Sequence, residues 1–599
     1  MGHWFESSFR LIRNSSVGRA MKQSLFAFCP VFNWTDSSVV ERSAVNGMVI
    51  SSNLIQSSKF GAFASATVFF PSKKILEWRF KTQKFPHLGV RGFMKFNIFN
   101  KQKPEIVNYE GAKAFRMTPA LELYTSVVTS SLSDTFYEKT DARLIRIQEL
   151  IRKNDAQFVA KLAVYARERM YMRSMPLVLV TELAKIHQGD NLVSRAVGRV
   201  VQRADEITEL LAYYQLANQR KEVKKLNRLS KQIQKGLGDA FNRFDEYQFS
   251  KYNRINTAVK LKDALFLVHP KAKNEAQQLI FDKIAKDELK TAETWETTLS
   301  AVGQNDFENE NGKIEAKTQA WEALIMDGKL GYMAILRNLR NIIEANVSQE
   351  AIEKVCATLS NARAVANSKQ FPFRFLSAYR ELKRLNSGRV SNILSALELA
   401  VQHSAANIRG FDAQTRVVIA ADVSGSMQTN ISPKSVVQNF DIGLMLAMLL
   451  QNRCDNVVTG MFGDTWKIIN MPKRNILSNV EECRRREGEV GYSTNGHLVI
   501  QDLINRRQVV DKIMIFTDCQ LWNSQGGNTV QVVWKQYRAI NPNAKLYLFD
   551  LAGYGTTPIK VIENQSVFLI AGWSDKVFDI LSAIEDGSDA VGVIEGMVI

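Results

Sequence analysis

Apolar residues recur at three- and four-residue intervals through most of the stretch from about residue 103 to residue 409. The pattern is clearest in segments 156–167 and 175–186. Because this period places apolar side chains on one face of an α-helix, the stretch is predicted to be helix after helix. Helices without intervening strands favour an α-solenoid, in which each pair buries its apolar face against the next. No strict period is visible, which favours degenerate HEAT-like repeats.

The pattern changes near residue 410, where short apolar runs begin to alternate with helical ones. The runs that predict buried strands begin at Arg416, Asn456, Lys512, Lys545 and Ser566. The helical patterns cover residues 441–451, 530–540 and 575–584. Apolar strands that alternate with helices predict a doubly wound α/β fold, with a parallel sheet covered on both faces.

The length of 599 residues and the apolar content of 45% leave room for several domains, each with its own core. We divide the chain into an N-terminal extension (residues 1–93), a helical region (94–409) and a sheet domain (410–599). No run of eighteen apolar residues occurs, so no transmembrane helix is predicted. The five cysteines form no CxxC pair, which argues against a disulfide framework or a zinc site and favours a reducing compartment such as the cytoplasm.

The first predicted strand of the sheet domain runs directly into a turn of the pattern DxSxS, formed by Asp422, Ser424 and Ser426. Thr494, in a glycine-containing loop, and Asp518, at the end of another apolar run, supply two further oxygen atoms. Open α/β sheets bind ligands at the carboxyl ends of their strands, so the two carboxylates are expected to converge. Oxygen ligands of this kind suit a hard divalent cation such as Mg²⁺. The alternative is a turn whose side chains only hydrogen-bond their own backbone.

Positive charge is concentrated in the helical region. Residues 94–409 hold 49 Lys and Arg against 36 Asp and Glu, whereas residues 410–599 hold 17 against 20. This asymmetry favours a polyanionic partner for the helical region. A stripe at helical spacing suits a phosphate backbone, although a solvated helix face is the alternative. The stripe comprises Lys221, Lys224, Lys225, Arg228, Lys231 and Lys235.

Aromatic residues follow the basic stripe and allow two interpretations. They could stack on nucleic-acid bases, but aromatic residues at this spacing more often belong to a core. The residues are Phe241, Phe244, Tyr247, Phe249 and Tyr252.

Segments 321–342 and 368–380 resemble the TROVE module of telomerase-associated, Ro and vault proteins. The five oxygen-bearing residues of the sheet domain match the metal-ion-dependent adhesion site of von Willebrand factor A domains. In this order, over about residues 94–599, the two modules resemble a bacterial Ro autoantigen homologue. The resemblance implies helical repeats closed into a ring, with the von Willebrand factor A domain joining the ring's ends.

The same resemblance implies particular RNA partners. Single-stranded RNA ends would enter the central hole, while small Y-like RNAs and misfolded non-coding RNAs would lie on the basic outer surface. Bacterial members are implied to tether a 3′-to-5′ exoribonuclease through a Y RNA.

Two segments, 250–254 and 260–265, resemble the family's outer RNA-binding helices. The residues implied there are Lys251, Arg254, Lys260 and Lys262. A histidine that the family often carries near the start of the second helix has no counterpart here. Arg337 and Arg340 lie three residues apart and would share a polar helix face, so they could line the hole. Caps or ion pairs between repeats are the alternative.

Two classes of function follow from these features. The first is a monomeric RNA-binding scaffold in RNA quality control. The second is a metal-dependent protein-assembly module, because a divalent ion held by two carboxylates keeps affinity for a partner's acidic oxygen. Catalysis is not expected, since the six histidines are dispersed and no Ser/His/Asp arrangement or phosphate-loop lysine is present.

Residues 1–93 show neither helical nor strand periodicity. Segments 13–20 and 36–46 resemble peptides that arise when a transfer RNA gene is translated in a chance frame, whereas Met94 begins a sequence typical of this family. We therefore expect the native protein to begin at Met94 and the extension to be non-native or disordered. A targeting presequence is the alternative.

Overall fold

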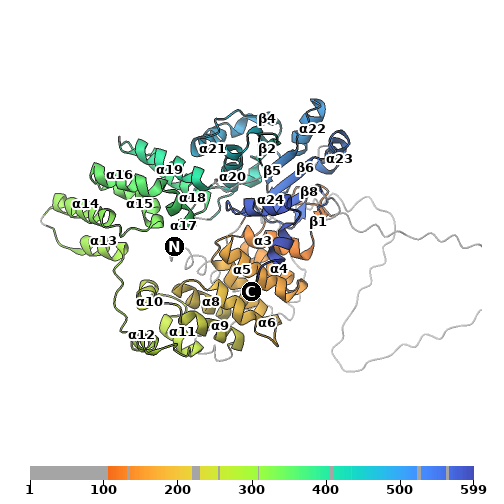
Figure 1. Cartoon of the computed structure of the whole chain (residues 1–599). Helices are drawn as coiled ribbons and strands as arrows, with labels where there is room; N and C mark the ends of the chain where they lie inside the picture. The colour runs from red at the N-terminus through yellow and green to blue at the C-terminus, as the bar shows by residue number, and fades with distance from the viewer. Residues whose placement is uncertain are drawn as a thin grey trace, which may run out of the picture. The chain divides into compact units, whose positions relative to one another are not determined.

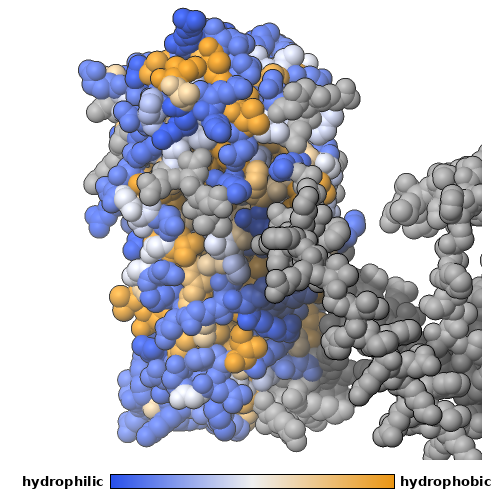
Figure 2. All heavy atoms as spheres, turned by 90° about the vertical axis from the view of Figure 1, so that its right-hand side faces the viewer, coloured by the Kyte–Doolittle hydropathy of each residue, from blue (hydrophilic) through white to orange (hydrophobic). Residues whose placement is uncertain are grey.

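The computed structural model describes residues 106–130, 135, 137–218, 229–253, 256–307, 309–404, 411, 413–432, 435–522, 528–561 and 566–599. The predicted extension, residues 1–93, lies outside them. On the face shown in Figure 2, hydrophilic residues surround smaller groups of apolar ones. Of the helices that the structure describes, none combines the length and the apolar character that a membrane crossing requires.

Between residues 119 and 404, the described regular elements are all helices, as the sequence predicts (Figure 1). Each packs against helices that are close to it in the chain. Side-chain caps set several of the starts; Asp155, for example, accepts hydrogen bonds from the amides of Gln157 and Phe158 at the start of α5. The helices are α3 (Pro119–Val128), α4 (Thr140–Lys153), α5 (Ala156–Glu168), α6 (Ser174–Ile186), α7 (Leu192–Val200), α8 (Ala204–Ala217), α9 (Lys231–Phe241), α10 (Glu246–Tyr252), α11 (Leu261–Val268), α12 (Glu275–Lys286), α13 (Trp295–Gln304), α14 (Glu310–Met326), α15 (Tyr332–Glu344), α16 (Gln349–Ser360), α17 (Ala362–Ser368), α18 (Pro372–Lys383) and α19 (Val390–Ser404).

The remainder forms a six-stranded sheet in the order β4-β3-β2-β5-β6-β8. All neighbours run parallel except the edge strand β4, which pairs antiparallel with β3. The doubly wound α/β prediction is therefore confirmed, while the three-residue strand β4 was not predicted. The strands are β2 (Arg416–Asp422), β3 (Asn456–Phe462), β4 (Trp466–Ile468), β5 (Lys512–Thr517), β6 (Lys545–Asp550) and β8 (Val567–Ala571). The helices are α20 (Asn439–Arg453), α21 (Ile476–Arg485), α22 (His497–Asn505), α23 (Val530–Ile540), α24 (Val577–Glu585) and α25 (Ala590–Glu595), with short 3₁₀ turns η3 (Gly425–Gln428) and η4 (Glu487–Glu489).

The first helices of the helical region dock on the sheet domain. The hydroxyl of Tyr124, on α3, lies 3.0 Å from the carbonyl oxygen of Ala571 at the end of β8. Arg143 and Arg146, on α4, donate to the carbonyl oxygens of Ala552 and Gly553 at 2.6 and 2.7 Å. These bonds satisfy backbone oxygens at the end of β6, so they fix the two parts against each other.

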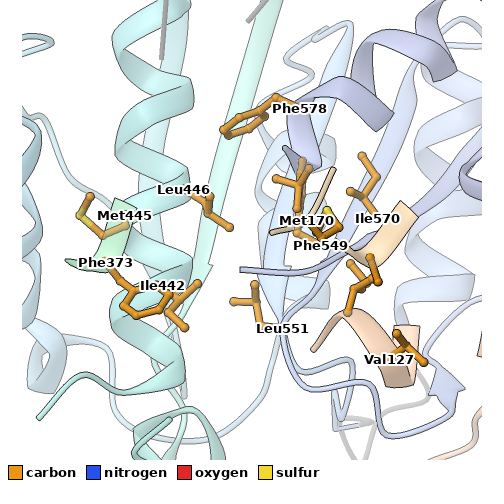
Figure 3. Packing of buried hydrophobic residues seen from close by; sticks show 14 of the residues in the cluster. Val127, Met170, Phe373, Ile442, Met445, Leu446, Phe549, Leu551, Ile570 and Phe578 are labelled. Atoms are coloured by element: carbon orange, nitrogen blue, oxygen red, sulfur yellow. The ribbon is translucent and has the colours of Figure 1, made fainter. Parts of the chain in front are cut away.

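The last helices of the helical region dock on the sheet domain as well. In Figure 3, Phe373 of α18 lies beside Ile442 of α20. Val127 of α3 lies in the same half of the view as Phe549 and Ile570. One continuous apolar core includes both contacts. The helical region is thus held by the sheet domain at both of its ends.

A short segment ahead of α3 also reaches the sheet domain. Its two-residue strand β1 (Phe115–Arg116) pairs antiparallel with β7 (Thr556–Thr557). Strand β7 belongs to the loop that follows β6, at the carboxyl end of the parallel strands. Residues 106–116 are therefore positioned close to the edge of the sheet where ligands bind in this class of fold.

Candidate metal centre and nucleic-acid interface

The two predicted metal carboxylates lie at the ends of adjacent parallel strands. Asp422 ends β2, and Asp518 follows directly after β5. Both side chains are 1% exposed. The chain turns sharply after Asp518, because Cys519 adopts a left-handed backbone conformation with φ of 62°. The strand register therefore brings the carboxylates to one edge of the sheet, as the sequence predicts.

Hydroxyl groups surround this pair of carboxylates. The Oγ atoms of Ser424 and Ser426 are 3.3 Å apart, and both residues are buried. Thr517 donates from its hydroxyl to Oδ2 of Asp422 at 2.7 Å. Thr494 lies in the loop before α22, where its carbonyl oxygen accepts from the amide of Trp522, four residues beyond Asp518. The five predicted residues thus come from three loops at the same edge.

Two of these oxygen atoms lack partners. Oγ1 of Thr494 and Oδ2 of Asp518 are buried, and neither hydrogen-bonds any described residue. Buried polar atoms are rarely left without a partner, since this costs free energy. A cation that binds hydroxyl and carboxylate oxygens would satisfy both atoms, so the residues fit a divalent metal.

The electrostatics of the site favour the same ligand. Burial, and then the charge of Asp422, raise the pKa of Asp518 to about 7. Burial raises the pKa of Asp422 to about 6, although hydrogen bonds from Ser424 and Thr517 oppose the rise. Without a cation, the ionised pair is therefore disfavoured. A divalent ion would supply the missing positive charge.

The segment ahead of α3 crosses this edge of the sheet, which the sequence did not indicate. The side-chain amide of Asn108 donates to the carbonyl oxygen of Leu521 at 2.8 Å. The backbone amide of Tyr109 donates to Oε1 of Gln520 at 2.9 Å. The hydroxyl of Tyr137 donates to Oε1 of Glu110. Tyr109 and Glu110 form a turn in a stretch that was predicted to be helical, and Tyr137 lies between α3 and α4.

Half of the predicted RNA-binding residues cannot be placed. Lys221, Lys224, Lys225, Arg228 and Arg254 lie outside the described residues. Lys231, at the other end of the predicted stripe, begins α9.

Three predicted residues lie on or beside α10 and α11. Lys251 is exposed, and its Nζ is 5.8 Å from the centroids of the Tyr247 and Tyr252 rings. Lys260 is exposed at the start of α11. Lys262 is paired with Asp287 at 2.6 Å, so part of its charge is already balanced. Lys251 and Lys260 are therefore the stronger candidates for phosphate contacts.

The aromatic residues of this part divide between core and surface. Phe241, Phe244 and Phe249 are buried and contact one another, with ring centroids 5.7 to 5.8 Å apart for the pairs that include Phe249. They belong to the core and are not available to stack on bases. Tyr247 is 48% exposed.

Arg337 and Arg340 lie on α15 and differ in their partners. Arg340 pairs with Glu344 at 2.7 Å and lies 4.0 Å from Glu381, so it forms the ion pairs that the sequence left as an alternative. Arg337 is exposed and makes no ion pair with any described residue. The charge of Arg337 acts on a second arginine on α18, Arg374, which sequence reasoning missed.

Arg374 is in an unfavourable environment for a cation. Burial, and then the charge of Arg337, lower its pKa to about 10. No described carboxylate pairs with it. Two arginines on neighbouring helices, with no ion pair to a described carboxylate, are suited to an anion such as phosphate. Phe373 and Phe375, on either side of it, are buried in the core, but nothing in the sequence linked α18 to α15.

A basic cleft lies where α18 meets the sheet domain. Its volume is about 310 Å³. The residues that line it are Arg380, Lys383, Arg384, Val436, Glu481 and Arg484. Four of the six carry positive charge, although Arg380 and Arg484 are also engaged with Asp441.

Comparison with known proteins defines the class of protein. The TROVE domain family matches residues 120–306 and 286–421, and the Ro60 vWA domain family matches residues 416–584. The crystal structure of the Deinococcus radiodurans RO (RSR) protein superposes with a TM-score of 0.51 and 16% identity, covering 78% of this chain and 100% of that one. The fold and the family matches agree on one architecture. It is a helical TROVE region followed by a von Willebrand factor A domain.

The chain belongs to the Ro family of TROVE-domain proteins. Two other similar proteins are telomerase protein component 1 of Mus musculus, 22% identical over 326 residues, and that of Rattus norvegicus, 24% identical over 345 residues. These alignments cover 41% and 45% of this chain but only 12% and 13% of those proteins. The chain is thus similar to only a small part of each of these much longer proteins.

Proposed function

We propose that the protein is an RNA-binding scaffold without catalytic activity of its own. The observation that carries this proposal is the pair Arg337 and Arg374, two arginines on adjacent helices that no described carboxylate neutralises. A bound phosphate would offset both the burial and the repulsion by Arg337 that lower the pKa of Arg374. Membership of the Ro family and the basic balance of residues 94–409 support the same proposal.

In this proposal, two kinds of RNA bind at two places. Single-stranded 3′ ends of misfolded or decaying non-coding RNA contact Arg337 and Arg374. Y-like structured RNA contacts the outer surface that carries Lys251 and Lys260, continued by the stripe from Lys221 to Arg228. The docking of both ends of the helical region on one sheet domain supports a closed ring around the single-stranded RNA. A 3′-to-5′ exoribonuclease tethered through the Y-like RNA would then act on the captured end.

The proposal includes a bound Mg²⁺ ion in the sheet domain. Asp422, Ser424, Ser426, Thr494 and Asp518 would hold it. The ion supplies the positive charge that two buried carboxylates lack. We assign the ion a structural role in this scaffold, in which it balances the charge of two buried carboxylates.

The second candidate function is metal-dependent assembly, in which the ion captures a carboxylate from a partner protein. The number of predicted ligands favours this candidate, because Mg²⁺ takes six oxygen ligands and five residues of the chain leave one position to be filled. The segment that carries Glu110 counts against it, since this segment lies over the approach to the site.

Filter binding with a salt titration distinguishes the two functions. An RNA scaffold should lose affinity by orders of magnitude between 50 and 200 mM salt, because several phosphates release counterions, while chelator should have little effect. A carboxylate-binding module should respond to chelator and hardly to RNA. The double variant Lys221→Glu with Lys225→Glu should weaken structured RNA broadly. Unchanged RNA affinity in that variant would assign the stripe to a solvated surface.

A further inference from the structure

The carboxylate of Glu110 is connected to a proposed metal ligand through a tyrosine hydroxyl. The hydroxyl of Tyr137 donates to Oε1 of Glu110, and the same phenol hydrogen-bonds Ser426. The charge of Glu110 adds to burial in raising the pKa of Asp422. Glu110 is therefore linked to the site through one tyrosine hydroxyl, although the described residues contain no three acidic side chains already grouped closely enough to hold a metal ion.

The backbone around Glu110 is fixed in a tight turn that presents this carboxylate. Oδ1 of Asn108 accepts from the amides of Glu110 and Ala112 at 3.1 and 2.9 Å. Gly111 closes the turn with φ of 75°, a conformation that favours glycine. The turn is thus held by its own hydrogen bonds, whether or not a cation is bound.

The turn is also anchored to the loop that carries Asp518. Gln520 accepts from the amide of Tyr109 through its side chain, while its own amide donates to Oδ1 of Asp518 at 2.9 Å. One residue therefore links the turn to a metal ligand directly. Asn108 makes a second link, to the carbonyl oxygen of Leu521 in the same loop.

Three tyrosines pack together next to this turn. The rings of Tyr109 and Tyr137 stack with centroids 5.1 Å apart, and both contact the buried Tyr554 edge-on at 5.5 and 5.3 Å. Tyr554 lies in the loop after β6, so the cluster joins the turn to the sheet domain. Aromatic packing of this kind limits the movement of the segment and the access of water.

We propose that Glu110 is the carboxylate of this chain that completes the coordination of the metal, so that the ion clamps residues 106–116 onto the sheet domain. This inference rests on the metal site proposed above. Mg²⁺ requires six oxygen ligands, and an anchored carboxylate reaches it at a smaller entropic cost than a carboxylate from solution. To reach the ion, the carboxylate of Glu110 would exchange the hydroxyl of Tyr137 for it. The site is then closed to the carboxylates of other proteins unless the segment is displaced.

The test combines Mg²⁺ titration calorimetry with hydrogen exchange of the full chain, in wild type and in Glu110→Gln. Wild type should bind Mg²⁺, and exchange of amides in residues 106–116 should slow when it does. Glu110→Gln should bind Mg²⁺ about tenfold or more weakly and lose the Mg²⁺-dependent protection. Glu149→Gln, which changes an exposed glutamate on α4, should behave as wild type.

Two results would overturn the proposal, and they are distinguishable. If Glu110→Gln and wild type bind Mg²⁺ equally and show equal protection of residues 106–116, Glu110 is not a ligand and the metal site stands. If wild type binds no more Mg²⁺ than the variant Asp518→Asn, the metal site itself is absent and the clamp is absent with it.

Discussion

The guanidinium group of Arg380 donates two hydrogen bonds to the carboxylate of Asp441, at 2.8 and 2.6 Å. Arg380 lies on α18 of the helical region and Asp441 on α20 of the sheet domain, and the two residues are 8% and 0% exposed. Arg484, on α21, donates to the same carboxylate. This buried network joins the end of the helical region to the sheet domain.

Removal of Arg380 should destabilise the protein strongly. In Arg380→Ala, Asp441 stays buried and keeps only Arg484 as a charged partner, so we expect a loss of about 3 kcal/mol in the free energy of unfolding. The exposed pair of Arg384 and Glu381 provides the control, since Arg384→Ala should cost less than about 1 kcal/mol. Urea unfolding measures both variants. Equal losses in the two would contradict a role for the network in the junction.

The other junction should be sensitive to a single methyl group. Gly553 has φ of 64°, and a Cβ there would lie 2.4 Å from Oγ1 of Thr129 and 2.7 Å from the carbonyl oxygen of Thr125. Gly553→Ala should therefore lower the free energy of unfolding by more than the roughly 1–2 kcal/mol that backbone strain alone would cost. Gly587→Ala is the matched control, because Gly587 also has positive φ but an added Cβ meets nothing within 4 Å. Thermal unfolding that ranks the two variants equally would exclude a close contact with α3.

Stabilisation by Mg²⁺ should depend on pH. Burial raises the pKa values of Asp422 and Asp518 in the folded protein to about 6 and about 7, so the folded state binds protons more tightly than the unfolded state. The protonated carboxyl groups therefore contribute their full stabilisation below about pH 4. It is lost as the pH rises through 6 to 7. Metal-free protein should therefore be less stable at pH 8 than at pH 5, and Mg²⁺ should raise Tm at pH 8 far more than at pH 5.

Calorimetric scans in EDTA and in Mg²⁺ at both pH values provide this measurement. Asp518→Asn is the control, because it removes one of the two titrating groups and one metal ligand together. The variant should show a smaller change in stability with pH and little response to Mg²⁺. A Tm increase of the same size at pH 5 and pH 8 in wild type would argue against metal binding by this pair.

Arg337 and Arg340 should differ in their effect on RNA. Arg337 makes no ion pair with a described residue, so Arg337→Ala should lower the affinity for a single-stranded oligonucleotide about three- to tenfold and reduce the salt slope by about one. Arg340 is already paired with Glu344, so Arg340→Ala should have a smaller effect. Fluorescence anisotropy at several salt concentrations measures both. An effect of Arg340→Ala that exceeds that of Arg337→Ala would refute this assignment.

Much of the sheet domain could be predicted because its elements have strong local patterns. Continuous apolar runs predicted strands β2 and β5. The polar residues at the ends of these runs indicated Asp422 and Asp518 as metal ligands. The short edge strand β4 has no such run. Glu110 was not predicted, because its connection to a metal ligand depends on pairing between β1 and β7, which are more than four hundred residues apart.

The helical region shows the same limit. Periodicity predicted its helices, but it could not show which charged residues meet across helices. The charge of Arg337 acts on Arg374 because α18 packs on α15, and Arg340 is balanced by acids on its own and an adjacent helix. Helical spacing therefore predicted which residues share a helix face. The three-dimensional structure was needed to identify the charged residues with which they pair.

The central claim is that the helical region binds RNA, and ultraviolet cross-linking in the cells that make the protein tests it most directly. Sequencing the attached RNA and mapping the cross-linked peptides by mass spectrometry give both partners at once. We expect small structured non-coding RNAs and RNA 3′ ends, with cross-links in α10–α11 and at α15 and α18. Recovery of RNA no higher than that of a control protein, from cells in which this protein is abundant, would contradict the claim.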